Sequence, residues 1–371
     1  MFNNVYKNKK ALVTGHTGFK GSWLAMWLCE LGAEVVGYAL EPPTNPNHFD
    51  LIGLEIETVI DDVRNADKIK NVVKSYKPDI IFHLAAQSLV RRSYSFPVET
   101  FATNVMGTVN VLEACRASDS VSAVVNITSD KCYENREQLE GYRETDRLGG
   151  QDPYSASKGC AEIVTNAYLR SFFSEEAYRR SHTTLVATAR SGNVIGGGDW
   201  AKDRLVPDIV RAASKDKKAV IRNPRAVRPW QHVLEPLSGY LRLGQRLLER
   251  QAACVGAWNF GPDKEGHLTV MDVLDALRKN WNAIDFAIND ANPAAPHEAG
   301  LLKLDCSKAR QELNWRPTWE SLKMIAKTVQ WYRDFYTSEK VTSHRQLLEY
   351  IQDAADQNIA WLNNEDITNP D

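Results

Sequence analysis

The sequence of 371 residues lacks several features that define particular classes of protein. It contains no apolar run of about 18 residues, the length that a transmembrane helix needs. The basic N-terminus MFNNVYKNKK precedes only a short apolar stretch, which glycines and a histidine interrupt. A formal net charge of -2 gives no basic field that would attract a nucleic-acid backbone. We therefore expect no membrane partner and no nucleic-acid partner, and we predict a cytoplasmic location.

Cysteine is also scarce and carries no metal-binding pattern. Six cysteines are scattered without CxxC or Cys/His spacing: Cys29, Cys115, Cys132, Cys160, Cys254 and Cys306. This arrangement argues against a zinc site and against a disulfide framework. We predict no bound metal and reduced, mostly buried thiols.

The order of patterns along the chain predicts the fold class. Short β-rich runs cover 11–14, 34–38, 58–60, 79–84, 122–128 and 184–189, and helical patterns cover 21–31, 66–75, 99–117 and 153–172. Strands and helices that alternate in this way indicate βαβ units. We predict an α/β fold with a Rossmann-like, doubly wound parallel sheet, which binds ligands at the carboxyl ends of its strands.

The sequence beyond about residue 190 becomes irregular and rich in Gly, Pro, Trp and Arg, with helical patterns at 206–213, 234–250, 269–280 and 318–336. We interpret this part as a smaller, mainly α-helical substrate-binding lobe that is partly interleaved with the first. The expected boundaries are 1–189 for the domain with the parallel sheet, 190–337 for this lobe and 338–371 for a helical tail on the outside.

A glycine loop follows the first predicted strand and opens the first helix. In VTGHTGFKGSW, Gly15 permits a tight turn, Gly18 lets backbone N–H groups approach a pyrophosphate, and Gly21 lets the helix pack on the sheet. A purely structural turn is the alternative. His16 and Lys20 could each place a cation beside a phosphate or point to solvent.

The end of the second strand bears on the choice of cofactor. Tyr38 stands where an acidic residue usually holds an adenosine ribose, and no arginine follows to bind a 2′-phosphate. The pattern alone leaves NAD and NADP open, and the missing arginine favours NAD. Asp62 is either an adenine partner or a surface acid. The predicted cofactor-binding residues are Gly15, His16, Gly18, Phe19, Lys20, Gly21, Asp62, Val63, Leu84, Ala85, Ala86, Asn104, Tyr154 and Lys158.

A candidate catalytic group consists of Tyr154 and Lys158, in YSASK, together with Ser129. The first two lie four residues apart on one face of a predicted helix. The lysine lowers the pKa of the tyrosine and can hold a nicotinamide ribose, so that the tyrosinate serves as general base toward an alcohol that loses hydride. Ser129 ends the fifth strand, where its hydroxyl can share the substrate's proton.

Five strings together resemble a known family: TGHTGFKGSW, HLAAQ, TSDKCY, YSASK and RSGNVIGGGDW. They are similar to the extended short-chain dehydrogenase/reductases that act on nucleotide sugars, and more narrowly to the 4,6-dehydratases whose substrate is CDP-glucose. The similarity extends to about residue 335, and HTGFKGSW and GGGDW are its most specific parts.

This resemblance implies an activity. The family's enzymes oxidise carbon 4 of the hexose with NAD, eliminate water between carbons 5 and 6, and return the hydride to carbon 6. We therefore expect a hydro-lyase that converts CDP-glucose to CDP-4-keto-6-deoxyglucose, for deoxysugars of a bacterial surface polysaccharide such as the lipopolysaccharide O-antigen. The resemblance also implies a homodimer or higher homo-oligomer, formed through the helix that carries YSASK.

The resemblance gives roles to Asp130 and Lys131. Related dTDP-glucose dehydratases carry Asp-Glu at the two positions after the triad hydroxyl, and this chain carries Asp-Lys. Asp130 corresponds to the acid that protonates the departing hydroxyl, provided that burial raises its pKa. Lys131 is either the base that removes the carbon-5 proton, which requires its pKa to fall by about three units, or a cation that stabilises the enolate. An exposed ion pair is the alternative for both.

The substrate end is predicted from polar residues beyond the sixth strand. Arg190 and Asn193 lie at the strand terminus, and Arg228 matches the family's phosphate-binding arginine. The predicted substrate-binding residues are Gln87, Ser88, Arg190, Asn193, Arg204 and Arg228. Arg222 and Arg225 are either further phosphate ligands or surface residues. Trp200 and Trp230 either stack on the base or pack in a core.

Two other functions are compatible with parts of the sequence. A nucleotide-sugar 4-epimerase shares the fold, the NAD and the triad, but it has no use for an acid-base pair after Ser129. A non-catalytic NAD-binding regulator typically loses the tyrosine or the lysine, and both Tyr154 and Lys158 are present.

Overall fold

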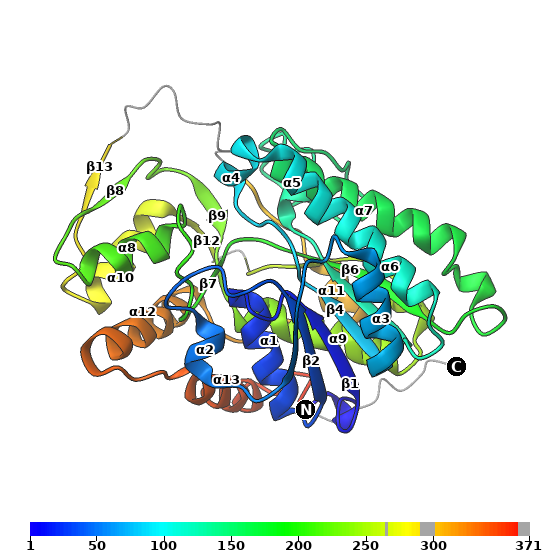
Figure 1. Cartoon of the computed structure of the whole chain (residues 1–371). Coiled ribbons are helices and arrows are strands. Elements are labelled where there is room, and N and C mark those ends of the chain that lie inside the picture. The colour runs from blue at the N-terminus through cyan, green and yellow to red at the C-terminus, as the bar shows by residue number, and fades with distance from the viewer. Residues whose placement is uncertain (264–265, 290–300, 363–371) are drawn as a thin grey trace.

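The computed structural model of the chain describes residues 1–263, 266–289 and 301–362. Its centre is a seven-stranded sheet with the order β11-β6-β5-β4-β1-β2-β3 (Figure 1). The strands are β1 (Lys10–Thr14), β2 (Glu34–Ala39), β3 (Glu57–Ile60), β4 (Ile80–His83), β5 (Ala123–Ile127), β6 (Leu185–Ser191) and β11 (Gly256–Phe260). Every neighbouring pair is parallel, so the predicted doubly wound sheet is confirmed.

Helices cover both faces of this sheet (Figure 1). The first face packs on α1 (Phe19–Glu30) and α9 (Leu234–Leu248), and the second packs on α3 (Ala66–Tyr76), α6 (Gly107–Arg116) and α7 (Pro153–Ser171). Strand residues alternate between the two cores, because successive side chains point to opposite faces. In β1, for example, Ala11 and Val13 belong to the first core and Leu12 to the second.

The seventh strand comes from the segment predicted to belong to the substrate lobe. β11 runs beside β6, and Phe260 is paired with Ser191. Its sequence, GAWNF, gives only a weak strand signal, because the run is short and contains glycine, alanine and asparagine. The chain therefore returns to the first sheet after residue 190.

The second lobe has its own hydrophobic core. Its helices are α8 (Leu205–Ala213), α10 (Val270–Asn280) and α12 (Ser321–Ser338). Three two-stranded pairs border it: β8 (Ala219–Ile221) with β13 (Phe286–Ile288), β9 (Val227–Pro229) with β12 (His267–Thr269), and β7 (Val194–Ile195) with β10 (Gln231–His232). This lobe stands beside the carboxyl ends of the main strands (Figure 1).

The remaining helices are short, apart from the last. They are α2 (His48–Ile52), α4 (Val90–Ser95), α5 (Pro97–Phe101), α11 (Ser307–Glu312) and α13 (Ser343–Asp356). A π-helical segment, Ala102–Met106, joins α5 to α6 into the single helix expected from the sequence. The tail helix ends earlier than its pattern indicates, and it is integrated in the fold, since Leu347 and Tyr350 are buried in the first core. Residues 363–371 of the predicted tail lie outside the described residues.

Candidate active site

A cavity of about 1250 Å³ lies at the carboxyl ends of the strands, between the sheet and the second lobe. The glycine loop and the ends of β2, β4, β5 and β6 line it on one side, and the segments around α8, β8 and β9 line it on the other. Single-ligand pockets usually measure about 300 to 1,000 Å³. The cavity therefore has room for a dinucleotide and a second ligand.

The glycine loop forms a cradle that only glycine permits. Gly15 has a φ of 78°, and a Cβ there would lie 2.8 Å from the backbone nitrogen of Ala85. A Cβ on Gly21 would lie 2.1 Å from the carbonyl oxygen of Gly15. Helix α1 begins at Phe19 without a side-chain cap, so its first N–H groups are directed to the cavity. These residues fit a bound pyrophosphate.

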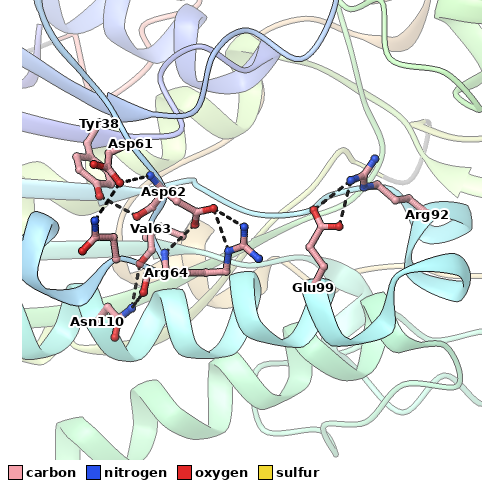
Figure 2. Close-up of polar contacts among 9 residues, drawn as sticks. Tyr38, Asp61, Asp62, Val63, Arg64, Arg92, Glu99 and Asn110 are labelled. Carbon is pink, nitrogen blue, oxygen red and sulfur yellow. Dashed lines mark hydrogen bonds and ion pairs between the residues drawn. The ribbon is translucent and has the colours of Figure 1, made fainter.

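The loop after β3 forms the other end of this dinucleotide site (Figure 2). Tyr38, at the end of β2, donates its hydroxyl hydrogen to the carbonyl oxygen of Asp62 over 2.8 Å. The Asp62 carboxylate accepts from the backbone N–H and the side chain of Arg64, which holds the pKa of Asp62 below its usual range. Asn110 fixes the loop by donating to the carbonyl oxygen of Val63. Tyr38 thus supports the loop in place of the usual ribose-binding acid.

His16 does not occupy the position that the sequence suggests. Its side chain is fully buried and does not line the cavity, and neither ring nitrogen has a hydrogen-bond partner among the described residues. Burial lowers the pKa of His16 to about 4, so the ring is neutral. The ring packs edge-on against Phe49 beside Gly37, where a Cβ would lie 2.4 Å from it. The prediction that His16 supplies a cation to a phosphate is therefore wrong.

Lys20 reaches across the cavity wall instead of turning to solvent. Its ammonium group donates to the hydroxyls of Ser191, over 2.9 Å, and Tyr240, over 3.3 Å. Burial is the main cause that lowers the pKa of Lys20 to about 7, and the positive charges of Arg204 and Lys158 add to it. The lysine thus joins the glycine loop to the ends of β6 and α9.

The three residues of the expected catalytic group meet at the floor of the cavity. Pro153 begins α7 and Asp152 caps it by accepting from the N–H of Ser155, which places Tyr154 in the first turn. The ammonium group of Lys158 donates to the carbonyl oxygen of Ile127 over 3.2 Å, and burial lowers the pKa of Lys158 to about 8. Burial raises the pKa of Tyr154 to about 12, and a hydrogen bond with Ser129 opposes this rise.

Asp130 and Lys131 form one turn directly after Ser129. The Ser129 hydroxyl caps this turn, donating to Oδ1 of Asp130 over 2.9 Å and accepting from the N–H of Lys131 over 3.2 Å. Asp130 is 2% exposed, and its Oδ2 has no hydrogen-bond partner among the described residues. Burial raises the pKa of Asp130, and the charges of Lys131 and Arg228 oppose it. The carboxyl group is buried, so the exposed ion pair is excluded for Asp130.

The predicted substrate residues gather on the side of the second lobe. Gln87, Ser88, Asn193, Arg204 and Arg228 all line the cavity. The Arg204 guanidinium donates to Asp199 over 2.9 Å and to the Ser88 hydroxyl over 3.1 Å, so it connects the two sides of the cavity.

Of the remaining candidate residues, Arg222, Trp200 and Trp230 line the cavity and Arg225 does not. Trp200 packs edge-on against Trp331 in the core of the second lobe, and Trp230 belongs to the same core. Both tryptophans also face the cavity, so packing and ligand contact are compatible at these positions.

Two predicted ligand residues lie behind the cavity wall. The Arg190 guanidinium is saturated by Glu162, the Tyr133 hydroxyl and the Glu144 carbonyl oxygen, and its side chain is 3% exposed. Asn104 binds the backbone of Gln87 and the hydroxyl of Ser157. Neither lines the cavity, so the predicted ligand contacts are replaced by roles in holding the wall.

Tyr240 supports the site from behind the cavity wall, and no sequence pattern indicated it. Its hydroxyl lies 2.7 Å from that of Ser191, and both accept from Lys20. Ser191 lies in the RSGN string beside Asn193, so the sequence could have indicated it as a site residue. Tyr240 comes from the middle of α9, where only the packing of that helix on β5 and β6 brings it to the site.

The described part of the chain holds no group of three His, Cys, Asp or Glu side chains arranged to ligate a metal. Within the same residues, no helix combines the length and the apolar character needed to cross a membrane.

Comparison with known proteins places these features in a family. The family model described as GDP-mannose 4,6 dehydratase matches residues 12–328. The CDP-glucose 4,6-dehydratase of Salmonella typhimurium is 48% identical over 353 residues, which cover 94% of this chain and 98% of that protein.

Solved structures support the fold. The UDP-glucose 4-epimerase of Thermus thermophilus in complex with NAD has a TM-score of 0.75 at 23% identity, covering 87% of this chain and 99% of the other. The dTDP-glucose 4,6-dehydratase of Bacillus anthracis in complex with NAD has a TM-score of 0.71 at 21% identity, covering 89% and 98%. From the family model and the Salmonella relative, the chain belongs to the GDP-mannose 4,6 dehydratase family.

Proposed function

We propose that the chain is a hydro-lyase that converts CDP-glucose to CDP-4-keto-6-deoxyglucose and water, with NAD as its cofactor. The observation that carries this function is the turn Ser129-Asp130-Lys131, which brings an acid and an amine beside Tyr154 and Lys158 in one cavity. The relative that is 48% identical over nearly the whole chain has this activity by name.

NAD fits the part of the cavity that begins at the glycine loop. We assign its pyrophosphate to Gly15, Gly18 and Gly21, its adenosine to the loop around Asp62, and its nicotinamide ribose to Lys158 and Tyr154. When bound, NAD would supply the hydride acceptor for carbon 4 and the hydride donor for carbon 6. No separate reductant is needed, because the two hydride transfers cancel.

The residues at the floor of the cavity manage the protons of the oxidation. Tyr154 takes the proton of the carbon-4 hydroxyl, acting as general base. Burial raises the pKa of Tyr154, and the hydrogen bond with Ser129 and the charge of Arg204 lower it. We assign a further share of this lowering to the ammonium group of Lys158, one turn further along α7. Ser129 orients the same hydroxyl through the hydrogen bond that it shares with Tyr154.

Asp130 and Lys131 serve the elimination. The carbon-5 proton becomes acidic only when carbon 4 is a ketone, and the departing hydroxyl must gain a proton. Asp130 supplies that proton, because burial raises its pKa and so favours the protonated form. Lys131, whose side chain lines the cavity, removes the carbon-5 proton and later returns it.

A 4-epimerase is the competing function. It would also oxidise carbon 4, but it returns the hydride to carbon 4 and needs no acid at carbon 6. The burial of Asp130 beside the triad favours the dehydratase.

Incubation of the purified protein with CDP-glucose in deuterated water tests the proposal. We expect a product that has lost one water and carries solvent deuterium at carbon 5, as seen by mass spectrometry and NMR. A hexose of unchanged mass with an inverted carbon 4 would identify an epimerase. Parallel incubations with GDP-mannose and dTDP-glucose test the choice of nucleotide sugar. We expect the fastest turnover with CDP-glucose.

A homodimer is part of the proposal. Apolar side chains are exposed on α4, α5, the π-helical segment and α7, which pack on one another. They include Phe96, Val98, Phe101, Met106 and Ile163, and Val98 is 81% exposed. A group of exposed apolar side chains on neighbouring elements is typical of a protein interface. The second copy would place its own α7 against this one.

We also propose a function for each part of the chain. Residues 1–189 bind NAD, and residues 190–337 bind the nucleotide sugar while returning β11 to the main sheet. Residues of α13 and the segment up to residue 362 support the first core. We place the enzyme in the cytoplasm, where nucleotide sugars are made and where its six free cysteines would stay reduced.

A further inference from the structure

The cavity extends from its floor into the second lobe, beyond the residues that the reaction itself needs. The reacting hexose is assigned to the floor, beside Ser129 and Tyr154. Arg228, on β9, lines the cavity near the floor, where its charge acts on Asp130. A nucleotide sugar runs from the hexose through the diphosphate to the ribose and the base. With the diphosphate at Arg228, the base would therefore lie farther into the second lobe.

This far end of the cavity is lined by α8 and β8, which lie on the side of β9 away from the main sheet (Figure 1). Apolar side chains come from the first turn of α8 and from β8: Leu205, Val206, Pro207, Ala219 and Ile221. A flat heterocycle packs its faces on such side chains, and its polar edge needs a few placed hydrogen-bonding groups. The far end thus fits a nucleobase.

Asp203 and Arg222 lie side by side at this end of the cavity. Asp203 comes two residues before α8, Arg222 directly follows β8, and both line the cavity. Nη2 of Arg222 lies 3.6 Å from Oδ1 of Asp203, and the two side chains are 41% and 43% exposed. Arg91, from α4 in the first domain, approaches the same oxygen over 3.5 Å. A carboxylate and a guanidinium are therefore held next to each other and are accessible to a ligand.

The edge of cytosine complements such a pair. Its exocyclic amine donates hydrogen bonds, and the adjacent N3 and O2 both accept them. A carboxylate can accept from the amine while a neighbouring guanidinium donates to N3 and O2. Uracil and thymine carry a carbonyl oxygen in place of the amine, and their N3 carries a hydrogen. The carboxylate would then face an acceptor and the guanidinium a donor, so these bases would be disfavoured.

We propose that Asp203 and Arg222 select the cytosine base of the substrate. Asp203 accepts from the exocyclic amine, and Arg222 donates to N3 and O2. Arg91 orients the Asp203 carboxylate through its contact with Oδ1. This inference rests on the proposed function, and it names the residues that distinguish CDP-glucose from UDP-glucose and dTDP-glucose.

A phosphate-binding role for Arg222 makes a different prediction. CDP and UDP carry the same diphosphate, so the loss of a phosphate contact would weaken the binding of both by the same factor. The loss of a base contact would weaken the binding of CDP far more than that of UDP. The ratio of the two dissociation constants therefore separates the two roles.

Calorimetric titration of the NAD-loaded protein with CDP and with UDP measures this ratio without any turnover. The variants are Arg222→Met, Asp203→Asn and the double variant Asp203→Asn with Arg222→Gln. Arg225→Met is the matched control, because Arg225 is an exposed arginine three residues further along that does not line the cavity.

For the wild type we expect CDP to bind about 10-fold or more tightly than UDP. Arg222→Met and Asp203→Asn should each lower this preference by about 5-fold or more, since each removes one side of the base contact. The double variant offers an amide donor to the uracil carbonyl oxygen and an amide acceptor to N3–H, so it should bind UDP at least as tightly as CDP. Arg225→Met should keep the wild-type ratio.

Equal weakening of CDP and UDP in Arg222→Met would assign Arg222 to the phosphates and overturn the proposal. A wild type without preference for CDP, or single variants that keep the full preference, would overturn it as well. If the wild type prefers CDP through these residues but forms no keto product from CDP-glucose, the proposed function is refuted and the selection of the base stands.

Discussion

Glu162 and Arg190 form a buried ion pair with a nitrogen–oxygen distance of 2.8 Å, and each side chain is only 3% exposed. Glu162 lies one turn after Lys158 on α7, and Arg190 lies near the end of β6. The Glu162 carboxylate also accepts from the hydroxyls of Thr128 and Thr188. The pair therefore fixes the helix that carries the catalytic tyrosine and lysine to the strand behind the cavity.

Replacement of Arg190 by leucine should act on stability. Arg190→Leu leaves the Glu162 carboxylate buried without its charge partner, which typically costs about 3–5 kcal/mol in the free energy of unfolding. Denaturant titration measures this loss. Lys218→Met is the matched control, because Lys218 pairs with Asp285 at the exposed surface and its loss should change stability little.

The double variant Arg190→Leu with Glu162→Leu should recover part of that stability, because it removes both charges. If Arg190→Leu had wild-type stability but a raised KM for the nucleotide sugar, this account would be contradicted. Arg190 would then contact the substrate, as the sequence predicted.

Lys131→Ala should separate oxidation from elimination. If Lys131 is the base at carbon 5, addition of CDP-glucose should still reduce the bound cofactor, but formation of the keto product should fall by about 100-fold or more. The absorbance of the reduced cofactor and the product yield give the two rates. Lys74→Ala, on an exposed position of α3, is the control.

Loss of cofactor reduction in Lys131→Ala would show that the lysine serves the oxidation. An unchanged product rate would show that another group removes the carbon-5 proton.

Lys20 should make the stability of the protein depend on pH. Burial lowers the pKa of Lys20 to about 7 from its ordinary value of 10.5, so between these pH values the folded state binds fewer protons than the unfolded state. Stability contributed by this group therefore rises with pH, by at most about 1.4 kcal/mol per pH unit. Lys20→Met should be more stable than the wild type near neutral pH, and the difference should shrink as pH rises.

Urea titrations of the wild type, Lys20→Met and the exposed control Lys74→Met over this pH range measure the effect. Lys158, whose pKa is also lowered by burial, is present in all three proteins. A difference between Lys20→Met and the wild type that does not change with pH would exclude a titrating amine at Lys20.

The exposed apolar surface on α5 and α7 should control assembly. Val98→Asp combined with Ile163→Asp introduces charges at two exposed positions, which should cost little in the monomer but should disrupt a desolvated interface. Light scattering should show the wild type as a dimer and the variant as a monomer with an unchanged circular dichroism spectrum. A monomeric wild type would exclude the dimer. A variant that stays dimeric would place the interface elsewhere.

The sequence predicted the elements that depend on local patterns. Six strands, the glycine cradle and the Tyr154–Lys158 pair follow from periodicity and from spacing within one turn or one helix. The residues that the sequence placed wrongly depend on the third dimension. His16 turns inward because Gly37 on the neighbouring strand leaves space for its ring, and no pattern within the loop reports that space.

Arg190 shows the same limit. Its position at the end of β6 suggested a ligand contact, but side chains of a strand alternate between the two faces, and this one faces Glu162 on α7. β11 and Tyr240 likewise join the sheet and the site from more than 45 residues beyond β6, through packing that acts over long sequence separations.

The proposed reaction depends above all on transfer of the hydride within one sugar, and CDP-glucose that carries deuterium at carbon 4 reports this transfer. After incubation with the protein, NMR and mass spectrometry locate the label in the product. We predict a 4-keto-6-deoxy sugar with the deuterium at carbon 6. Deuterium that remains at carbon 4 of a hexose, or that is lost to the solvent, would contradict the proposed reaction.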